Sequence, residues 1–308
     1  MILNDKRTLA VSSLGWVDHG SLWICSVEAP PQKIVLSDAK YLSVSAGAKD
    51  FFAVVHHWDG QRLEITAHAY SAPQTTISRL ALRQAVPGLP SRIELLREGD
   101  LRVWDQLPGA FTGYAFGDYR LVLTRLAGED DVQALEWFDD SYDKGYQGIV
   151  GSIEVPDTSL LIISVQRDSH PVLYSPETKK AIRKLSLADR TGNPSFQFRT
   201  SAREFWATDY DSVVKLDGTT LAVRNVQCVQ NAVHGMRQFI GNFCFNSGQD
   251  LCLIARPFSG DAVALDADSM AQVCRIEFGR QPLDIGMLAD GTVVARDWKT
   301  GDSLFRRL

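Results

Sequence analysis

Two stretches of this chain repeat the same order of strands and turns, and this repetition constrains the fold more than any other feature. Residues 151–187 align with residues 241–278 with a single one-residue shift. Each copy has an alternating segment, a polar turn, a continuous apolar segment and a second polar turn. A short strand follows and leads through a tight turn into a last alternating strand. Alternation with a period of two, bounded by turn residues, is typical of β-strands. Each copy is therefore predicted to form a four-stranded antiparallel sheet.

Looser copies of this unit occupy much of the remaining chain, at residues 41–83, 111–138, 195–227 and 283–308. Strand starts recur about every 40–45 residues, which is the repeat length of β-propeller blades. No long segment has the periodicity of a helix. We therefore predict an all-β fold, in which residues 1–308 form a single closed β-propeller domain of about seven four-stranded antiparallel blades.

The two ends of the chain predict how the ring closes. The last copy supplies three strands, whereas an extra strand at residues 8–12 precedes the first complete copy. Many propellers complete the last blade with a strand from the other terminus, because closure removes exposed sheet edges. We expect the N-terminal strand to do so here. A hairpin near residues 90–106 exceeds this count, and it is either an insertion or part of an eighth blade, so six to eight blades stay open.

Short motifs resemble those of known propeller families. Residues 264–294 contain an Asp-bearing turn between outer strands, followed by the step Gly279-Arg-Gln-Pro282. This segment resembles YVTN and quinoprotein-type propellers. The pairs Trp58-Asp59 and Trp104-Asp105 are similar to those of WD40 repeats, although the Gly-His dipeptide of that family is missing from every copy. The resemblance implies a fold and no particular activity.

Composition argues against several classes of partner. The net charge is −5 and no run of basic residues is present, so we expect no nucleic-acid binding. No apolar stretch approaches the roughly 20 residues of a membrane-spanning helix, so we expect no membrane association. The first residues lack the apolar centre of a signal peptide, and five cysteines are an odd number for a disulfide framework. A cytoplasmic protein is expected, although a signal peptide already removed would leave the same pattern.

Aromatic, Arg and Asp residues recur in the turns between the second and third strands of the predicted sheets. These turns lie on the same face of a propeller as the loops between blades. Trp, Tyr and Arg are enriched at binding hot spots because they bury much surface for each rotamer that is fixed. We therefore predict a binding rim for a protein partner, unless these rings pack on neighbouring sheets and the Asp residues cap turns. The candidate residues are Trp58, Asp59, Arg167, Asp168, Tyr210, Asp211, Arg256, Phe258, Asp297 and Trp298.

The sequence contains no nucleophile elbow, phosphate-binding loop, dinucleotide motif or zinc-protease motif. We therefore favour a non-enzymatic binding or scaffold protein that needs no cofactor. The alternative is a lactonase-like or hydrolase-like propeller enzyme, with or without a metal, whose small-molecule site lies at the mouth of the axial channel. A third reading is a ring that contacts a larger complex through its side.

No metal site is predicted. The acidic loop at residues 137–146 matches a Ca²⁺ loop poorly and is interpreted as solvated. The histidines His19, His170 and His234 have no spacing that would bring them together. Cys244, Cys252 and Cys274 alternate with apolar residues and are expected in the core.

Overall fold

The computed structural model describes strands along the whole chain. It describes side chains for Pro30 and for residues 152–164, 170–178, 180–187, 194–230 and 238–308. None of these described residues is helical. Within them, no helix is long and apolar enough to cross a membrane.

Antiparallel pairing joins the strands of the N-terminal half into three four-stranded sheets. The first contains β1 (Ile2–Asn4), β2 (Thr8–Ser13), β3 (Gly20–Ser26) and β4 (Gln32–Leu36). The second contains β5 (Tyr41–Ala46), β6 (Phe51–Trp58), β7 (Leu63–Tyr70) and β8 (Ile77–Ala81). The third contains β9 (Leu89–Leu95), β10 (Leu101–Gln106), β11 (Tyr119–Thr124) and β12 (Asp131–Ala134).

The C-terminal half continues the same order. The fourth sheet contains β13 (Ile149–Glu154), β14 (Leu161–Val165), β15 (Val172–Ser175) and β16 (Lys180–Lys184). The fifth contains β17 (Phe196–Arg199), β18 (Glu204–Asp209), β19 (Ser212–Asp217) and β20 (Val223–Cys228). The sixth contains β21 (Phe243–Phe245), β22 (Leu251–Arg256), β23 (Asp261–Asp266) and β24 (Gln272–Glu277). The last contains β25 (Pro282–Met287), β26 (Thr292–Asp297) and β27 (Ser303–Arg307).

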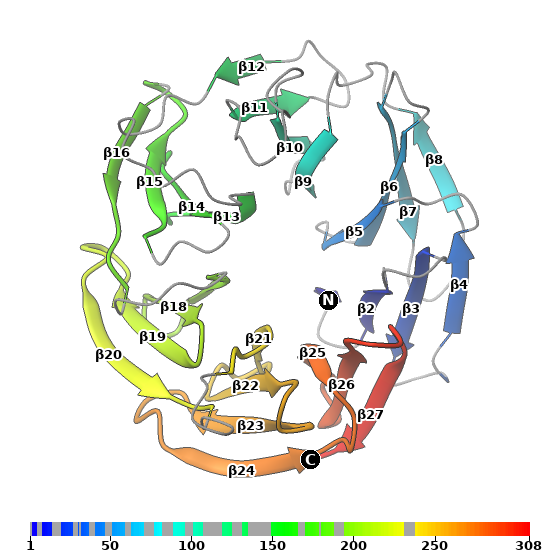
Figure 1. Cartoon of the computed structure of the whole chain (residues 1–308), viewed down its shortest axis with the longest axis vertical. Coiled ribbons are helices and arrows are strands. Elements are labelled where there is room, and N and C mark those ends of the chain that lie inside the picture. Colours follow the sequence, from blue (N-terminus) through cyan, green and yellow to red (C-terminus); the bar gives the residue numbers. More distant parts are fainter. Residues whose placement is uncertain are drawn as a thin grey trace.

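These sheets lie one after another around a central opening (Figure 1). Strands β13, β21 and β25 lie toward the opening, and β16, β20 and β24 lie at the periphery. Radial repetition of small antiparallel sheets is the architecture of a β-propeller. The all-β prediction with four-stranded antiparallel sheets is confirmed, and the two clear sequence copies form β13–β16 and β21–β24.

The N-terminal strand does not complete the last sheet, contrary to the prediction. Strand β2 pairs with β1 on one side and with β3 on the other, so both of its backbone edges are already hydrogen-bonded. The last sheet has three strands among those that the structure describes. The prediction failed because residues 20–26 and 32–36 were not recognised as strands, which left residues 8–12 without partners in the sequence reading.

The hairpin near residues 90–106 belongs to a regular sheet. Its two strands, β9 and β10, pair with each other, and β10 pairs in turn with β11. It therefore supplies half of the four-stranded sheet β9–β12.

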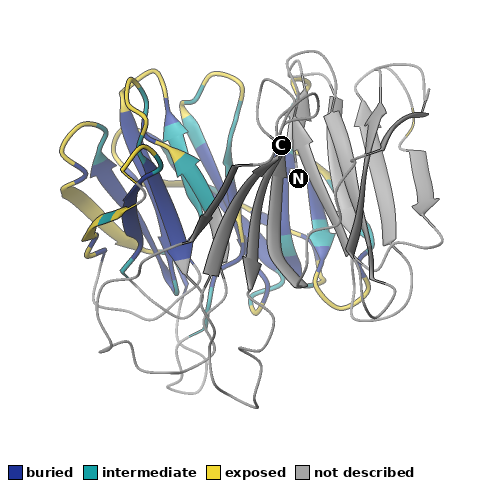
Figure 2. Cartoon of the chain, turned by 90° about the horizontal axis from the view of Figure 1, so that it is seen from above, coloured by how far each residue is buried: buried dark blue, intermediate teal, exposed yellow. Residues whose placement is uncertain are grey.

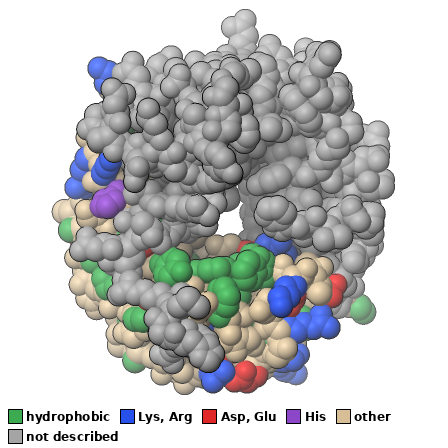
Figure 3. Space-filling model, in the orientation of Figure 1, with side chains coloured by type: hydrophobic (Ala, Val, Ile, Leu, Met, Phe, Trp, Pro, Cys, Tyr) green, Lys and Arg blue, Asp and Glu red, His purple; other side chains and the backbone are tan. Residues whose placement is uncertain are grey.

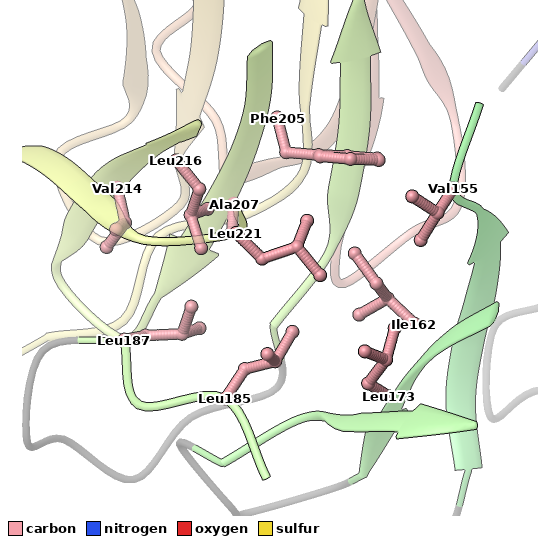
Figure 4. Packing of buried hydrophobic residues seen from close by; sticks show 10 residues of the cluster. All are labelled: Val155, Ile162, Leu173, Leu185, Leu187, Phe205, Ala207, Val214, Leu216 and Leu221. Atoms are coloured by element: carbon pink, nitrogen blue, oxygen red, sulfur yellow. The ribbon is translucent and has the colours of Figure 1, made fainter. Parts of the chain in front are cut away.

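Apolar clusters fill the boundaries between neighbouring sheets. One cluster joins β13–β16 to β17–β20 and includes Ile162, Leu173 and Phe205 (Figure 4). The next joins β17–β20 to β21–β24 around Trp206, and a further cluster joins β21–β24 to β25–β27 around Ala255 and Ile285. The sheets from the fourth to the last are thus packed against their neighbours, as in other repeat proteins.

Burial decreases from the middle strands to the periphery. All six residues of β18 are buried, whereas all six residues of β20 are exposed. Figure 2 shows in addition that the buried residues lie mainly in strands and the exposed residues mainly in turns. Of the three core cysteines, Cys252 is fully buried, and Cys244 and Cys274 pack against the cluster next to it. Burial raises the pKa of the Cys244 thiol to about 12, so this thiol is not a reactive thiolate at neutral pH.

A buried polar cluster joins the fifth and sixth sheets at one end of the strands. We call Arg199, Glu204, Trp206 and Lys215 the clasp. Glu204 Oε1 accepts hydrogen bonds from Arg199 Nη1 at 3.0 Å and from the Trp206 indole at 2.9 Å, and Lys215 Nζ lies 3.6 Å away. Arg199 and Lys215 also donate to the carbonyl oxygen of Ala267 in the sixth sheet. The four side chains of the clasp are buried, so the charges of Arg199, Glu204 and Lys215 are stabilised by one another and by the turn that follows β23.

Candidate functional site

Successive turns in an antiparallel sheet alternate between its two ends, and the candidate residues lie at the end opposite the clasp. This end contains the turn between β18 and β19, the turn between β22 and β23 and the turn between β26 and β27. It also contains residues 229–230, which follow β20, residues 238–242, which precede β21, and residues 278–281, which join β24 to β25. We call this end the rim.

Three aromatic rings from three segments meet at the rim. We call Phe239, Phe258 and Trp298 the aromatic cluster. The ring centroids lie 4.9 Å apart for Phe239 and Phe258, 5.2 Å for Phe239 and Trp298, and 5.7 Å for Phe258 and Trp298. The interplanar angles are between 70° and 90°, the edge-to-face arrangement that the ring quadrupoles favour. Even so, Phe258 is 39% exposed and Trp298 is 38% exposed.

The face of the ring shown in Figure 3 has a patch of hydrophobic side chains beside the central opening, with Lys and Arg side chains at its border. Exposed contiguous apolar surface is uncommon on soluble proteins and marks interaction sites.

The turn that carries Trp298 is fixed by Asp297. Its carboxylate accepts hydrogen bonds from the backbone amides of Lys299, Thr300 and Gln281, and from the Thr300 hydroxyl. Burial alone would raise the pKa of Asp297, but these hydrogen bonds outweigh it and hold the pKa below its ordinary value. Asp297 is therefore a charged cap of the turn, as the alternative sequence reading proposed.

The turn that carries Phe258 is joined to the connection before β25. Gly260 adopts a φ of +73°, and a methyl group added there would lie 3.2 Å from the carbonyl oxygen of Arg280. The carbonyl oxygen of Gly260 accepts hydrogen bonds from the amides of Phe278 and Gly279. The Trp298 amide donates to the carbonyl oxygen of Gln281 at 2.7 Å. One connecting segment therefore links the turns of Phe258 and Trp298.

The third ring, Phe239, was not among the predicted residues. The amide of the next residue, Ile240, donates to the carbonyl oxygen of Tyr210 at 2.7 Å, which holds this connection against the preceding sheet. Tyr210 itself is half-buried and has a φ of +54°. A connection has no alternation that would have identified Phe239, so only its aromatic character in a polar context could have drawn attention to it.

Two other predicted rim residues serve the fold instead. Arg256 is 7% exposed and forms a two-pronged ion pair with Asp261, with N–O distances of 2.7 and 2.6 Å. The remaining guanidinium nitrogen of Arg256, Nη1, donates to the carbonyl oxygen of Val229. Asp211 is also buried, and it accepts a hydrogen bond from Ser212. Neither side chain is presented to a partner.

The remaining predicted residues belong to the second and fourth sheets. Trp58 is the last residue of β6, and its side chain is outside the described set. Asp59, Arg167 and Asp168 also lie outside the described residues. The structure therefore brings together Phe258 and Trp298 of the ten predicted residues, and adds Phe239.

A polar group separate from the clasp is formed by Asn242, Asp284 and Arg296, which lie on or next to strands near the central opening. Asp284 on β25 accepts hydrogen bonds from Arg296 Nε at 2.6 Å and from the amide group of Asn242. Burial would raise the pKa of Asp284, but Arg296 and Asn242 outweigh it and lower the pKa. Among the residues with described side chains, no group of three His, Cys, Asp or Glu could hold a metal ion.

Comparisons with known proteins support the fold. No protein-family model matches the chain, and no curated protein matches it by sequence. Solved structures do match. The β-propeller domain of Cps50 (Swd1) from Myceliophteria thermophila has a TM-score of 0.67 and 12% identity, over 100% of this chain and 96% of that one.

Two structures with enzyme names are similarly close. A putative 6-phosphogluconolactonase from Bacteroides fragilis has a TM-score of 0.65 and 13% identity, over 99% of this chain and 95% of that one. The periplasmic gluconolactonase PpgL of Pseudomonas aeruginosa has a TM-score of 0.64 and 15% identity, over 96% and 94%. Likeness at these identities shows that the chain has a β-propeller fold, and it assigns no activity.

Proposed function

We propose that this protein is a non-enzymatic binding propeller whose aromatic cluster contacts a protein partner. The observation that carries the proposal is that Phe258 and Trp298 stay about two-fifths exposed although both rings touch each other and Phe239. Aromatic side chains at loop tips are characteristic of binding hot spots. The Swd1 propeller has the same fold, which is compatible with this role without assigning it.

The backbone around the cluster favours binding because it is already ordered. Hydrogen bonds from Trp298 to Gln281 and from Ile240 to Tyr210 hold two of the three segments in place. A partner that covers the rings therefore orders few groups, and each square ångström of apolar surface that it buries contributes about 25 cal/mol.

We further propose that the seven sheets are the blades of one closed ring, that the first and last sheets pack directly against each other, and that the protein is cytoplasmic. Support for the contact comes from β1, which lies close to β25 (Figure 1). Deletion of residues 1–7 would remove β1, and we expect one cooperative melting transition at a lower temperature. An unchanged melting temperature would contradict the proposed closure.

The binding proposal is tested by co-purification with matched variants. Tagged wild type, a Phe258→Ala/Trp298→Ala variant and a Val273→Ala control are expressed in the native host and captured, and bound proteins are identified by mass spectrometry. Val273 is exposed on the outer strand β24, away from the rim. We expect a partner that is retained by wild type and the control and lost at least tenfold in the double variant.

Contact with the cluster is then verified on the purified complex by hydrogen exchange. Protection at residues 238–242, 257–260 and 298–302 is expected. A partner retained equally by all three proteins, or protection confined to the outer strands, would contradict the proposal.

A second candidate is an enzyme of the lactonase or hydrolase class, supported by the group formed by Asn242, Asp284 and Arg296 near the opening. Against it, the Asp284 carboxylate is already paired with Arg296. Hydrolysis of δ-gluconolactone, measured with and without added Ca²⁺, Mg²⁺ or Zn²⁺, separates the two. Turnover that disappears in Asp284→Asn would favour the enzyme.

A further inference from the structure

We propose that the aromatic cluster selects an acidic peptide segment that carries one aromatic or aliphatic anchor residue. This inference rests on the binding function proposed above and adds the chemical class of the ligand. It follows from the charges that border Phe258 and Trp298 and from the angles between the rings.

Two cations border the cluster. Lys299 directly follows Trp298 in the turn and is exposed. The backbone of Arg280 packs against Gly260 in the turn of Phe258, and its side chain reaches Asp302 in the turn of Trp298 at 3.2 Å. Arg280 is therefore fixed between the two turns that carry the exposed rings, and Lys299 is the neighbour of Trp298 in the chain.

The carboxylates near these cations, Asp302 and Asp297, are both engaged by other groups and leave the Lys299 ammonium without a carboxylate partner among the described residues. Asp302 neutralises Arg280, and both side chains are about half exposed. Asp297 is 3% exposed, and its oxygens are occupied by the amides that it caps. Within the described part of the chain, no carboxylate pairs with the Lys299 ammonium. The exposed cation beside Trp298 is therefore Lys299, and Arg280 becomes available where a ligand carboxylate replaces Asp302.

A basic border around apolar rings is complementary to acidic residues that flank an apolar side chain. Carboxylates of the ligand would lie at Lys299 and Arg280, and its anchor residue would lie on the rings. Charge complementarity of this kind mainly raises the association rate and excludes basic competitors. The Arg280–Asp302 pair is about half exposed, so a ligand carboxylate can replace Asp302 at little cost.

The ring angles favour a side chain over a sugar or a base. A sugar ring or a nucleobase stacks on the flat face of an aromatic platform. Here, the interplanar angles of 90°, 75° and 70° turn each ring edge toward its neighbour, so no two rings share a plane. Contact with such a surface therefore favours a compact side chain such as Phe, Leu or Trp, which touches ring edges and faces together.

The test is selection from a random dodecapeptide library displayed on phage, with the full-length protein immobilised. We expect enriched peptides with a net charge of −2 or lower and one shared aromatic or aliphatic position. Affinities of synthetic copies are then measured by fluorescence anisotropy at about 50 mM and about 300 mM salt, between which screening of exposed charges increases strongly.

Variants separate the two parts of the inference. Trp298→Ala and Phe258→Ala are expected to weaken the selected peptides at least tenfold. Lys299→Glu is expected to weaken them about fivefold at low salt and less at high salt. Arg203→Glu is the control, because it makes the same charge change at an exposed position at the opposite end of the strands.

The outcomes are distinct. Acidic peptides that depend on both Trp298 and Lys299 support the inference. Basic or neutral peptides that still depend on Trp298 overturn the ligand class and leave the proposed function standing. Enriched peptides that are unaffected by Trp298→Ala, or a library that yields no enrichment, overturn the inference.

Discussion

The two ends of the strands in the fifth to last sheets carry different residues in different environments. At the clasp, Arg199, Glu204 and Lys215 are buried and pair with one another and with the next sheet. At the rim, Phe258 and Trp298 touch each other but stay exposed. Charged groups thus join sheets at one end, and apolar groups are offered to solvent at the other. The contrast suggests that the clasp maintains the fold and the rim is available for binding.

The strongest test of this contrast is Glu204→Ala. The change leaves the buried Lys215 charge without a carboxylate and leaves Arg199 paired only with Asp268, so we expect a loss of about 3–5 kcal/mol in the free energy of unfolding. Urea denaturation followed by circular dichroism measures it. Asp157→Asn breaks the exposed ion pair with Arg203 and serves as the control, with an expected loss of about 0–1 kcal/mol. A similar loss in both variants would show that the clasp does not stabilise the fold.

Two glycines extend the comparison, because each lies close to a backbone carbonyl oxygen and the two are at opposite ends of the strands. A methyl group on Gly218 would lie 2.1 Å from the carbonyl oxygen of Arg203, and one on Gly241 would lie 2.1 Å from that of Leu283. Either Gly→Ala change is expected to cost about 2–3 kcal/mol by thermal denaturation, since backbone must move. Only Gly241→Ala is also expected to weaken partner binding, because this residue lies in the connection that carries Phe239.

Gly248→Ala is the matched control for both. A methyl group there would meet the flexible side chain of Asp250 and no backbone atom. We expect a smaller loss of stability, and an equal loss in all three variants would mean that the close approaches are not the cause.

The sequence predicted the strands correctly where the repeated order of segments and turns was clear. Alternation and turn residues predicted β13–β16 and β21–β24, because a strand with one buried face must alternate. Residues 20–26 were missed because they were not aligned with the repeated unit, although they contain the continuous apolar run Leu22-Trp23-Ile24-Cys25, and the predicted ring closure failed with them.

The candidate site was predicted less well, because side-chain exposure is decided by partners distant from the turn itself. Arg256 has the character of a binding residue, yet Asp261 on the next strand and the Val229 carbonyl keep it buried. Phe239 is brought to Phe258 and Trp298 by the packing of successive sheets. Neither outcome has a signal in the sequence near the residue.

An intermediate change in stability is expected at Asp284, whose pKa is lowered in the folded protein. The unfolded carboxyl has the ordinary value of 3.8, so the stability that Asp284 contributes is present above that pH. It is lost as the pH falls below 3.8 and through the lower folded value. Asp284→Asn is expected to cost about 2 kcal/mol at pH 7.

The same substitution is expected to make stability less dependent on pH in this acid range. Urea titrations between pH 2.5 and 7 measure both effects. A variant that loses stability in acid as steeply as the wild type would show that Asp284 does not carry this dependence.

The smallest change in stability is expected at the rim. Phe258→Ala removes a ring that is partly exposed, so we expect a loss of about 1 kcal/mol. The comparison requires that binding falls much more than stability in this variant. A loss comparable to that of Glu204→Ala would mean that the aromatic cluster is a core element, like the clasp.

The exposed peripheral strand β20 has a consequence for the evolution of this chain. Its six residues all face water, so its side chains experience little selection for shape, and the strand is retained by its backbone pairing with β19. Substitutions can therefore accumulate there without loss of the fold. Solved propellers that agree with this chain over nearly their full length at identities of 12–15% show how few of its residues the fold itself requires.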